Sequence, residues 1–219
     1  MPLLAMLQAI LFDYDDTLVQ TKECKFAALR AIAQRHYALT LSDEVIREHW
    51  GVAYEQLFRA LFGAVEADVA RVIARYEAVN DEFPIAPYPE VLGVLRRLRQ
   101  RVAIGIVTSA GRALAARQLE RIGLAPSELS VFQGADDTPL HKPDPRVFEP
   151  ALAVLAARNI SRDAVLYVGD SLRDFAAARG AGLDFIGVLR GTTTPREFEA
   201  AGARYCRDLE ALIPLLGLS

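Results

Sequence analysis

Short apolar runs alternate along the chain with longer segments in which apolar residues recur every three or four positions. The short runs are typical of strands buried on both faces, and the longer segments are typical of amphipathic helices. The expected strands are residues 7–13, 102–107, 131–133, 164–168 and 184–188. The expected helices are residues 89–100, 112–122, 145–158, 172–179, 195–201 and 208–216. This alternation predicts an α/β fold built on a doubly wound, Rossmann-like parallel sheet.

One segment, residues 20–82, has only helical spacing and interrupts the alternation after the first expected strand. Pro84, Pro87 and Pro89 follow it, and prolines so close together favour an extended connector. We therefore expect two domains, an α/β core and an all-helical domain inserted into it. The predicted boundaries are 1–19 and 85–219 for the core and 20–84 for the helical domain.

Composition and charge narrow the possible classes of protein. The chain has 219 residues, 52% hydrophobic and 24% charged, which excludes disordered, collagen-like and coiled-coil chains. A net charge of −3 argues against a nucleic-acid partner. No apolar run approaches the about 18 residues of a membrane span, and the apolar start lacks the basic leader of a signal peptide. Cys24 and Cys206 stand in no metal or redox spacing, so we expect reduced thiols and a cytoplasmic location.

Polar residues gather where several expected strands end. Ligand sites in open parallel sheets form at the carboxyl ends of strands, so we expect these side chains to meet at one edge of the sheet. The clusters and one loop between them contain Asp13, Asp15, Asp16, Thr108, Ser109, Lys142, Asp170 and Asp174.

Carboxylates gathered in this way need a compensating cation. Two like charges 4 Å apart repel by about 4 kcal/mol at an effective dielectric constant of about 20. Hard carboxylate oxygens without histidine or cysteine nearby favour Mg²⁺. Lys142 and the hydroxyl groups of Thr108 and Ser109 favour an anion, and an anion beside Mg²⁺ suggests a phosphate. A carboxylate within reach of a phosphate can act as a nucleophile and form an aspartyl-phosphate.

Four motifs in order carry a resemblance that covers essentially the whole chain. They are FDYDDTL after the first strand, Thr108 after the second, Lys142 in HKPDP, and Gly169 to Asp174 in the pattern Gly-Asp-x-x-x-Asp. In these motifs the chain resembles the haloacid dehalogenase-like hydrolase superfamily, and within it the phosphatase branch typified by phosphoglycolate phosphatase. The helical insertion resembles the helical cap of that superfamily.

The resemblance implies a catalytic role for each matching residue. Asp13 corresponds to the nucleophile that attacks phosphorus, and Asp15 corresponds to the general acid and base. Thr108 corresponds to a hydrogen-bond donor to the phosphoryl group, with Ser109 beside it, and Lys142 corresponds to the group that neutralises charge. The implied activity is hydrolysis of a small phosphorylated metabolite, with no nucleic-acid or membrane partner.

The resemblance also implies a Mg²⁺ site and a role for the cap. Asp13, the backbone carbonyl of Asp15, and Asp170 correspond to metal ligands, and Asp174 corresponds to an outer ligand or a partner of the motif lysine. Trp50 and Tyr54 lie in the segment that resembles the cap loop facing the substrate. They are interpreted either as contacts to the leaving group or as part of the cap core, because aromatic residues at helical spacing are usually core.

Simpler interpretations of the same residues stay open. Asp13 and its acidic neighbours could form a solvated turn, and Thr108 could cap the next helix. Lys142 could be a surface lysine in a proline-rich loop. Asp174 could close a capping box with Ser171, a role compatible with a place in the site.

Other functions share parts of this pattern. A phosphomutase of the beta-phosphoglucomutase type would carry identical motifs. A 2-haloacid dehalogenase is disfavoured, because a departing halide needs no proton and Asp15 would have no task. A non-catalytic phospho-sensing or binding module is a further alternative. Asp16 stands where the superfamily often has glycine, and aspartate tolerates turn conformations well.

Overall fold

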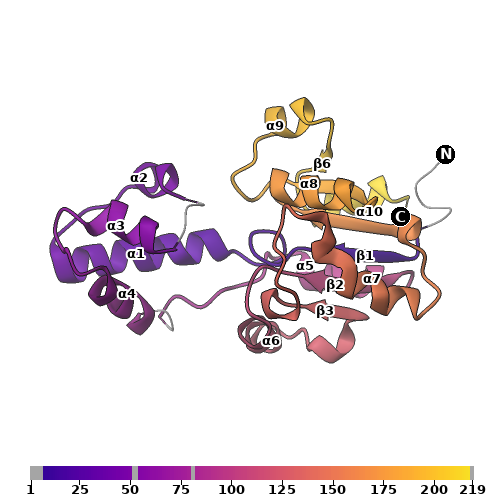
Figure 1. The fold of residues 1–219 in the computed structure, drawn as a ribbon, viewed down its shortest axis with the longest axis horizontal. Helices are drawn as coiled ribbons and strands as arrows, with labels where there is room; N and C mark the ends of the chain where they lie inside the picture. Colours follow the sequence, from indigo (N-terminus) through magenta and orange to yellow (C-terminus); the bar gives the residue numbers. More distant parts are fainter. Residues whose placement is uncertain (1–6, 51–53, 80–81, 218–219) are drawn as a thin grey trace. The chain divides into compact units, whose positions relative to one another are not determined.

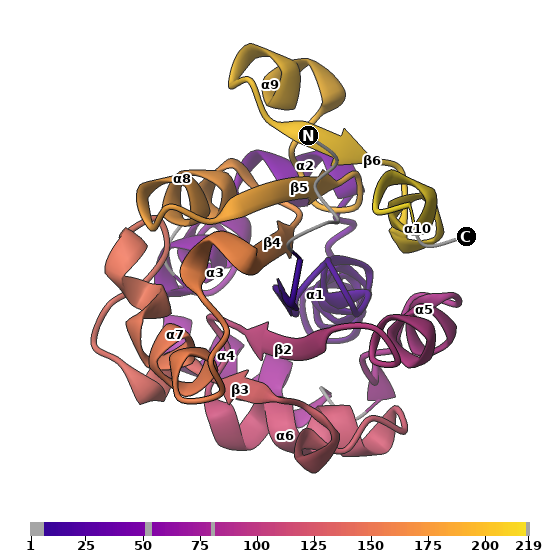
Figure 2. The ribbon, with the colours of Figure 1, turned by 90° about the vertical axis from the view of Figure 1, so that its right-hand side faces the viewer.

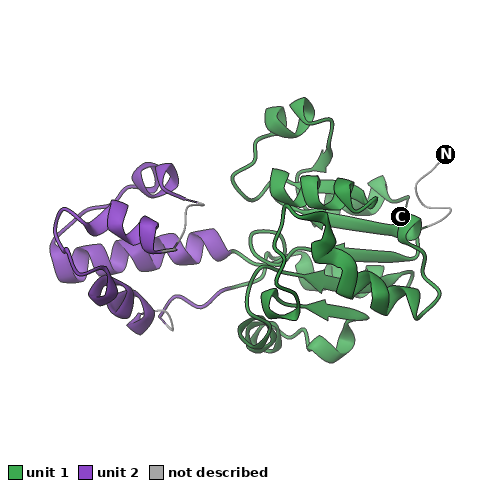
Figure 3. Cartoon of the chain, viewed as in Figure 1, with its two compact units in different colours: residues 1–20, 86–219 green, residues 21–85 purple. Residues whose placement is uncertain are grey.

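The computed structural model describes residues 7–50, 54–79 and 82–217 (Figure 1). Contacts divide the chain into two compact units (Figure 3). One, residues 1–20 and 86–219, holds the sheet and is called the sheet unit below. The other, Thr21–Ile85, is called the helical unit. No helix within the described residues is both long enough and apolar enough to cross a bilayer.

A six-stranded parallel sheet forms the centre of the sheet unit as far as the structure describes it. Its spatial order is β3-β2-β1-β4-β5-β6, so β1 lies between β2 and β4. The strands are β1 (Ala9–Phe12), β2 (Ala103–Val107), β3 (Val131–Gln133), β4 (Val165–Gly169), β5 (Asp184–Val188) and β6 (Arg204–Cys206). The chain starts in the middle of the sheet and builds one side with β2 and β3 and the other with β4 to β6. This order is the doubly wound α/β fold predicted from the sequence.

Helices cover both faces of this sheet, with α5 and α10 on one face and α7 and α8 on the other (Figure 2). Their apolar sides pack on strand residues, and Phe148, Tyr167 and Phe185 form part of the core on the α7–α8 face. The α-helices of the unit are α5 (Val91–Leu98), α6 (Arg112–Arg121), α7 (Glu149–Ala156), α8 (Leu172–Gly180), α9 (Pro195–Ala200) and α10 (Leu209–Leu215).

Two elements differ from the sequence predictions. The helix expected over residues 145–158 begins as a short 3₁₀ helix, η5 (Pro145–Phe148), and only then continues as α7. The edge strand β6 was not expected, because three residues of mixed exposure carry too little periodicity to predict a strand. It pairs only with β5, through the register Gly187 opposite Tyr205.

All elements of the helical unit within the described residues are helices, as the spacing predicts. Apolar residues from these helices form one core, in which Phe58, Phe62 and Ile32 are almost completely buried. The helices are α1 (Thr21–Tyr37), α2 (Asp43–Glu48), α3 (Tyr54–Phe62) and α4 (Val69–Ala78).

The two segments that join the units pair with each other on the sheet unit. The Gln20 amide donates to the Ala86 carbonyl at 2.9 Å, and the Tyr88 amide donates to the Leu18 carbonyl at 3.1 Å. Val19 and Pro87 form an antiparallel bridge between them. The outgoing and returning connectors therefore leave the sheet unit as a bonded pair.

Candidate active site

Asp13 directly follows β1 at the carboxyl end of the sheet. Its amide donates to the Val168 carbonyl of β4 at 2.8 Å, which extends the pairing of the two strands by one residue. Its side chain is 8% exposed, so a carboxylate is held in a largely water-free position. Burial of this kind is costly unless charged or hydrogen-bonding groups compensate for it.

Lys142 provides that compensation. Its ammonium group donates to Asp13 Oδ1 at 2.6 Å, to Asp174 Oδ1 at 2.7 Å and to the Tyr167 hydroxyl at 2.8 Å. Three donors and three acceptors leave none of the ammonium protons unpaired. The backbone carbonyl of Lys142 accepts from the Arg173 guanidinium at 2.5 Å, so the loop that carries the lysine is fixed to α8.

Tyr167 is a contact that sequence reasoning missed. It lies within β4 and is completely buried, and its hydroxyl is 3.2 Å from the Val107 carbonyl and 3.3 Å from Asp174 Oδ1. An aromatic residue within an apolar strand indicates core, and no feature of the sequence marks its hydroxyl as a partner of a lysine.

Asp174 has two structural roles at once. It closes a capping box with Ser171 at the start of α8, in which its Oδ2 accepts from the Ser171 amide at 3.2 Å. Its Oδ1 accepts from Lys142. Gly169 makes room for it, because a Cβ at residue 169 would lie 2.7 Å from Asp174 Cβ. The capping interpretation is therefore correct but incomplete.

Three carboxylates converge beside the lysine. Oxygens of Asp13, Asp170 and Asp174 lie within 4.8 Å of one another, and no other such group of potential metal ligands occurs within the described residues. The set contains only hard oxygen donors, which fits Mg²⁺ and does not fit a metal that prefers sulfur or imidazole. The Asp15 carboxylate is not part of this group. The metal ligand expected from Asp15 is its backbone carbonyl, and that role stays a prediction.

The electrostatics of these groups follow from burial and proximity. Burial raises the pKa of Asp13 to about 7, aided by the charges of Asp174 and Asp15 and opposed by Lys142. Burial likewise raises the pKa of Asp170 well above its ordinary value, with further increases from Asp13 and Asp174. Burial alone would lower the pKa of Lys142, but the carboxylates of Asp13 and Asp174 raise it well above its ordinary value. The site thus holds more negative charge than its one lysine balances, which is the condition that favours binding of a cation.

Thr108 follows β2 and is 4% exposed, and its amide donates to the Gln133 carbonyl at 3.0 Å. Its hydroxyl oxygen accepts from the Ala110 amide at 3.0 Å, which shapes the turn after the strand. The N-cap of α6 is Gly111, so the interpretation of Thr108 as that helix's cap is wrong. Ser109 is exposed.

Asp15 and Asp16 lie in a tight turn after Asp13. Asp16 adopts a φ of 54°, and its amide donates to the Val19 carbonyl at 2.9 Å. That left-handed conformation favours glycine, and aspartate is one of the few other residues that adopt it readily. Asp15 is half-buried, in contrast to the nearly inaccessible Asp13.

Of the two aromatic residues that the sequence analysis places in the cap loop, the structure describes the side chain of Trp50 but not that of Tyr54. Trp50 packs within the helical unit, with its ring 4.9 Å from that of Phe26 in an edge-on arrangement. Tyr54 begins α3, and its side chain lies outside the described residues, as do residues 51–53. The packing of Trp50 agrees with the interpretation of that residue as core, and its contact with substrate stays a prediction.

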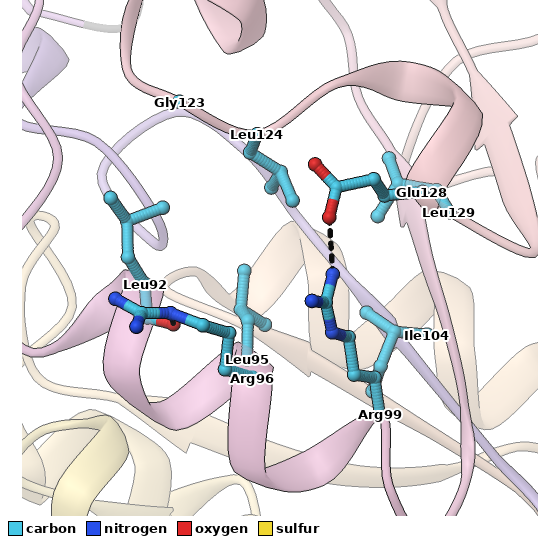
Figure 4. Close-up of a pocket in the computed structure, with 9 residues that line it drawn as sticks. All are labelled: Leu92, Leu95, Arg96, Arg99, Ile104, Gly123, Leu124, Glu128 and Leu129. Carbon is cyan, nitrogen blue, oxygen red and sulfur yellow. Dashed lines mark hydrogen bonds and ion pairs between the residues drawn. The ribbon is translucent and has the colours of Figure 1, made fainter.

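A pocket elsewhere in the sheet unit offers no comparable chemistry. It has a volume of about 140 Å³ and is lined by apolar residues such as Leu92, Leu95 and Leu124, with an ion pair between Arg99 and Glu128 (Figure 4). Ile104 in its wall belongs to the start of β2, whereas Thr108 follows the end of that strand. The pocket therefore lies toward the opposite edge of the sheet from the carboxylates.

The fold and site together define a doubly wound α/β protein with a carboxylate–lysine cluster at the carboxyl ends of β1 and β4. Residues 10–188 match the family model described as haloacid dehalogenase-like hydrolase, and the chain belongs to that family. It is therefore an enzyme of a hydrolase family, as the motifs predict.

Relatives agree with this assignment. A glyceraldehyde 3-phosphate phosphatase from Methanopyrus kandleri is 29% identical over 208 residues, which cover 85% of each chain. A phosphoglycolate phosphatase from Rhodospirillum rubrum is 29% identical over 200 residues, which cover 85% of this chain and 81% of that one. A crystal structure from Thermotoga maritima, provisionally named a beta-phosphoglucomutase, superposes with a TM-score of 0.82 at 23% identity, over 96% of this chain and 99% of that one. The last likeness concerns the fold alone.

Proposed function

We propose that this protein is a Mg²⁺-dependent phosphatase that hydrolyses a small phosphorylated metabolite through an aspartyl-phosphate on Asp13. The observation that carries the proposal is the cluster of Asp13, Asp170 and Asp174 at the carboxyl ends of β1 and β4, in which the buried Lys142 binds Asp13 and Asp174. Relatives named phosphatases of three-carbon and two-carbon phosphates support the substrate class.

Asp13 is the nucleophile in this proposal. One carboxylate oxygen is held by Lys142, which favours the ionised form that attacks phosphorus. Attack forms the Asp13 O–P bond and breaks the bond between phosphorus and the ester oxygen. Because one oxygen is fixed by a lysine that is itself held at three points, little reorganisation is needed before the reaction.

Asp15 is the general acid and base. It donates a proton to the departing ester oxygen, and the same carboxylate then accepts a proton from the water that hydrolyses the aspartyl-phosphate. The half-buried position of Asp15 supports this role, because the group must exchange protons with a leaving alcohol and with water. Asp13, almost completely buried, is suited to the covalent step instead.

Thr108, Ser109 and Lys142 hold the phosphoryl group. The Thr108 oxygen already accepts a hydrogen bond from Ala110, so its own O–H is available to donate to a phosphoryl oxygen. Ser109 is exposed beside it and can donate in the same way. Lys142 contributes positive charge next to the oxygen that attacks.

The Mg²⁺ site consists of Asp13, Asp170 and the backbone carbonyl of Asp15, with Asp174 as an outer partner. When bound, Mg²⁺ neutralises charge on the phosphoryl group and on the clustered carboxylates. We assign the helical unit the role of a cap that excludes water during the first step, with Trp50 and Tyr54 as candidate contacts to the leaving group.

Hydrolysis of p-nitrophenyl phosphate with and without Mg²⁺ tests the proposal. Asp13→Asn is expected to lower turnover by about 1,000-fold or more, because the covalent step loses its nucleophile. Asp184→Asn removes an exposed carboxylate at the opposite end of β5 and is the matched control, with turnover close to wild type. Turnover that persists in Asp13→Asn, or that needs no divalent cation, would contradict the proposal. Transfer of the phosphate between positions of a sugar, without release of inorganic phosphate, would indicate the phosphomutase instead.

A further inference from the structure

The sheet unit holds another buried cation besides Lys142. Arg190 follows β5, and its side chain is only 6% exposed. Its guanidinium forms an ion pair with Glu90 and lies 3.8 Å from the centre of the Tyr88 ring. It also donates to the backbone carbonyl of Thr17 at 2.6 Å. The function proposed above uses none of these contacts.

The partners of Arg190 lie on or next to both connectors of the helical unit. Thr17 directly precedes the outgoing connector at Leu18, Tyr88 lies on the returning connector, and Glu90 follows it as the N-cap residue of α5. Glu90 in addition accepts from the Leu209 amide at 3.3 Å, where α10 begins. Burial of an arginine–glutamate pair adds little net stability compared with apolar residues of the same size, so its main consequence is the geometry that it enforces.

The geometry that Arg190 enforces is that of the turn carrying Asp15. In this turn the amides of Leu18 and Val19 both donate to the Tyr14 carbonyl, at 2.9 and 3.2 Å. The Thr17 carbonyl points out of the turn to Arg190, which holds it from outside. Asp15 lies two residues before that carbonyl, so the group that Arg190 holds belongs to the same short turn as Asp15.

The residue after Arg190 makes a second contact with the site. A Cβ at Gly191 would clash with Asp170 Oδ2, so the backbone of this loop packs directly on the Asp170 carboxyl group. Arg190 and Gly191 together connect the turn after β1 with the acidic residue after β4.

We propose that Arg190 is a positioning residue for Asp15, and that it aims the general acid by holding the Thr17 carbonyl against the returning connector. The proposal rests on the function assigned above. A guanidinium suits this task better than an ammonium, because its planar, rigid set of donors can bind Glu90 and Thr17 together while stacking on Tyr88.

The test compares two aryl phosphates that differ in their need for a proton. p-Nitrophenolate leaves as a stable anion, whereas the more basic phenolate of phenyl phosphate depends on the general acid. The value of kcat/KM reports steps up to departure of the phenol, so the ratio of kcat/KM for the two esters measures proton donation. A general loss of structure lowers both values and leaves the ratio unchanged.

The double variant Arg190→Met/Glu90→Gln removes the ion pair without leaving one buried charge unpaired. The side-chain amide oxygen of the glutamine can still accept from the Leu209 backbone amide. We expect kcat/KM for phenyl phosphate to fall about tenfold more than for p-nitrophenyl phosphate. This change is smaller than complete loss of the general acid would cause, because Asp15 is misplaced and not removed. Arg207→Met, which removes a side chain that is 85% exposed, is the control and is expected to keep the wild-type ratio. Equal losses for both esters, or no losses, would overturn the proposal.

Arg190→Lys decides the question if the double variant does not fold. It keeps the charge but not the planar set of donors, and the ratio is expected to change about threefold in the same direction. An unchanged ratio in a folded Arg190→Lys protein would overturn the proposal.

Asp15→Asn separates this inference from the function on which it rests. It is expected to change the ratio in the same direction and by more than the Arg190 variants. If Asp15→Asn leaves the ratio unchanged, or if Asp13→Asn retains turnover, the proposed function fails. If Asp15→Asn changes the ratio and the Arg190 variants do not, only the positioning role fails.

Discussion

The hydroxyl group of Tyr167 lies 2.8 Å from the ammonium group of Lys142 and completes its set of three acceptors. The other two acceptors are the carboxylates of Asp13, which directly follows β1, and of Asp174, which lies in the first turn of α8. Tyr167 therefore fixes the direction of the lysine relative to Asp13 without adding charge to a site that already has an excess of it.

Tyr167→Phe is expected to lower the free energy of unfolding by about 1–3 kcal/mol, because an ammonium proton loses its partner in a buried position. Urea denaturation measures the change. Tyr205→Phe is the control, since its hydroxyl donates at 2.6 Å to Glu199 at an exposed position, and a loss within about 0.5 kcal/mol is expected there. Equal losses in the two variants would contradict the role given to Tyr167.

Stability should depend on pH through the buried carboxyl groups when divalent cations are chelated. Burial raises the pKa of Asp13 from the ordinary 3.8 to about 7, so the folded state keeps a proton that the unfolded state has already lost. Because the folded state binds more protons in this range, the free energy of unfolding falls as pH rises from about 4 to about 7. Thermal unfolding in a chelator at several pH values measures this slope.

Asp13→Asn and Mg²⁺ provide the controls for that slope. Asp13→Asn cannot ionise at this position, so its stability is expected to fall less over the same range. Mg²⁺ at about 100 times its apparent dissociation constant at the pH of the measurement should add about 2.7 kcal/mol to the wild-type protein. Because binding displaces protons from the buried carboxyl groups, the affinity for Mg²⁺ is expected to rise with pH. A chelated wild-type protein whose melting temperature is constant or rises from pH 4 to pH 7 would contradict the account.

Gly169→Ala is expected to destabilise the sheet unit by about 1–3 kcal/mol, because its Cβ would lie 2.7 Å from Asp174 Cβ in a filled region. Gly93→Ala is the matched control. Gly93 lies within α5, and apart from the backbone of its own helix and its two chain neighbours no atom lies within 4 Å of the added Cβ, so alanine is expected to stabilise by up to about 1 kcal/mol. Calorimetry on both variants measures the change in the free energy of unfolding, which is expected to be a loss for Gly169→Ala and a gain for Gly93→Ala. A loss in Gly93→Ala as large as in Gly169→Ala would refute the steric argument.

The sequence predicts the central part of the fold well and its edges less well. Strands β1, β2, β4 and β5 are buried on both faces, so each is an apolar run that can be recognised without the structure. β6 cannot be recognised in this way, because an edge strand of three residues is stabilised by pairing with β5 and not by its own pattern of apolar residues. The 3₁₀ start of α7 also depends on local packing that periodicity does not encode.

The candidate site divides in the same way. Acidic residues after strands, and a lysine between them, could be placed at one edge because parallel strands end together. Tyr167 and Arg190 could not. Each acts through a polar group on a residue whose position suggests something else: core for a tyrosine within a strand, and solvent for an arginine after one.

The central position of β1 has a consequence for synthesis on the ribosome. Ala9 pairs with Ala103 on one side and Val165 on the other, so the first strand emerges long before either of its neighbours. The helical unit is continuous in sequence and can bury its own core as soon as it has left the exit tunnel. We expect it to fold first during translation, while the strand that precedes Asp13 stays unpaired until β2 and then β4 have been synthesised.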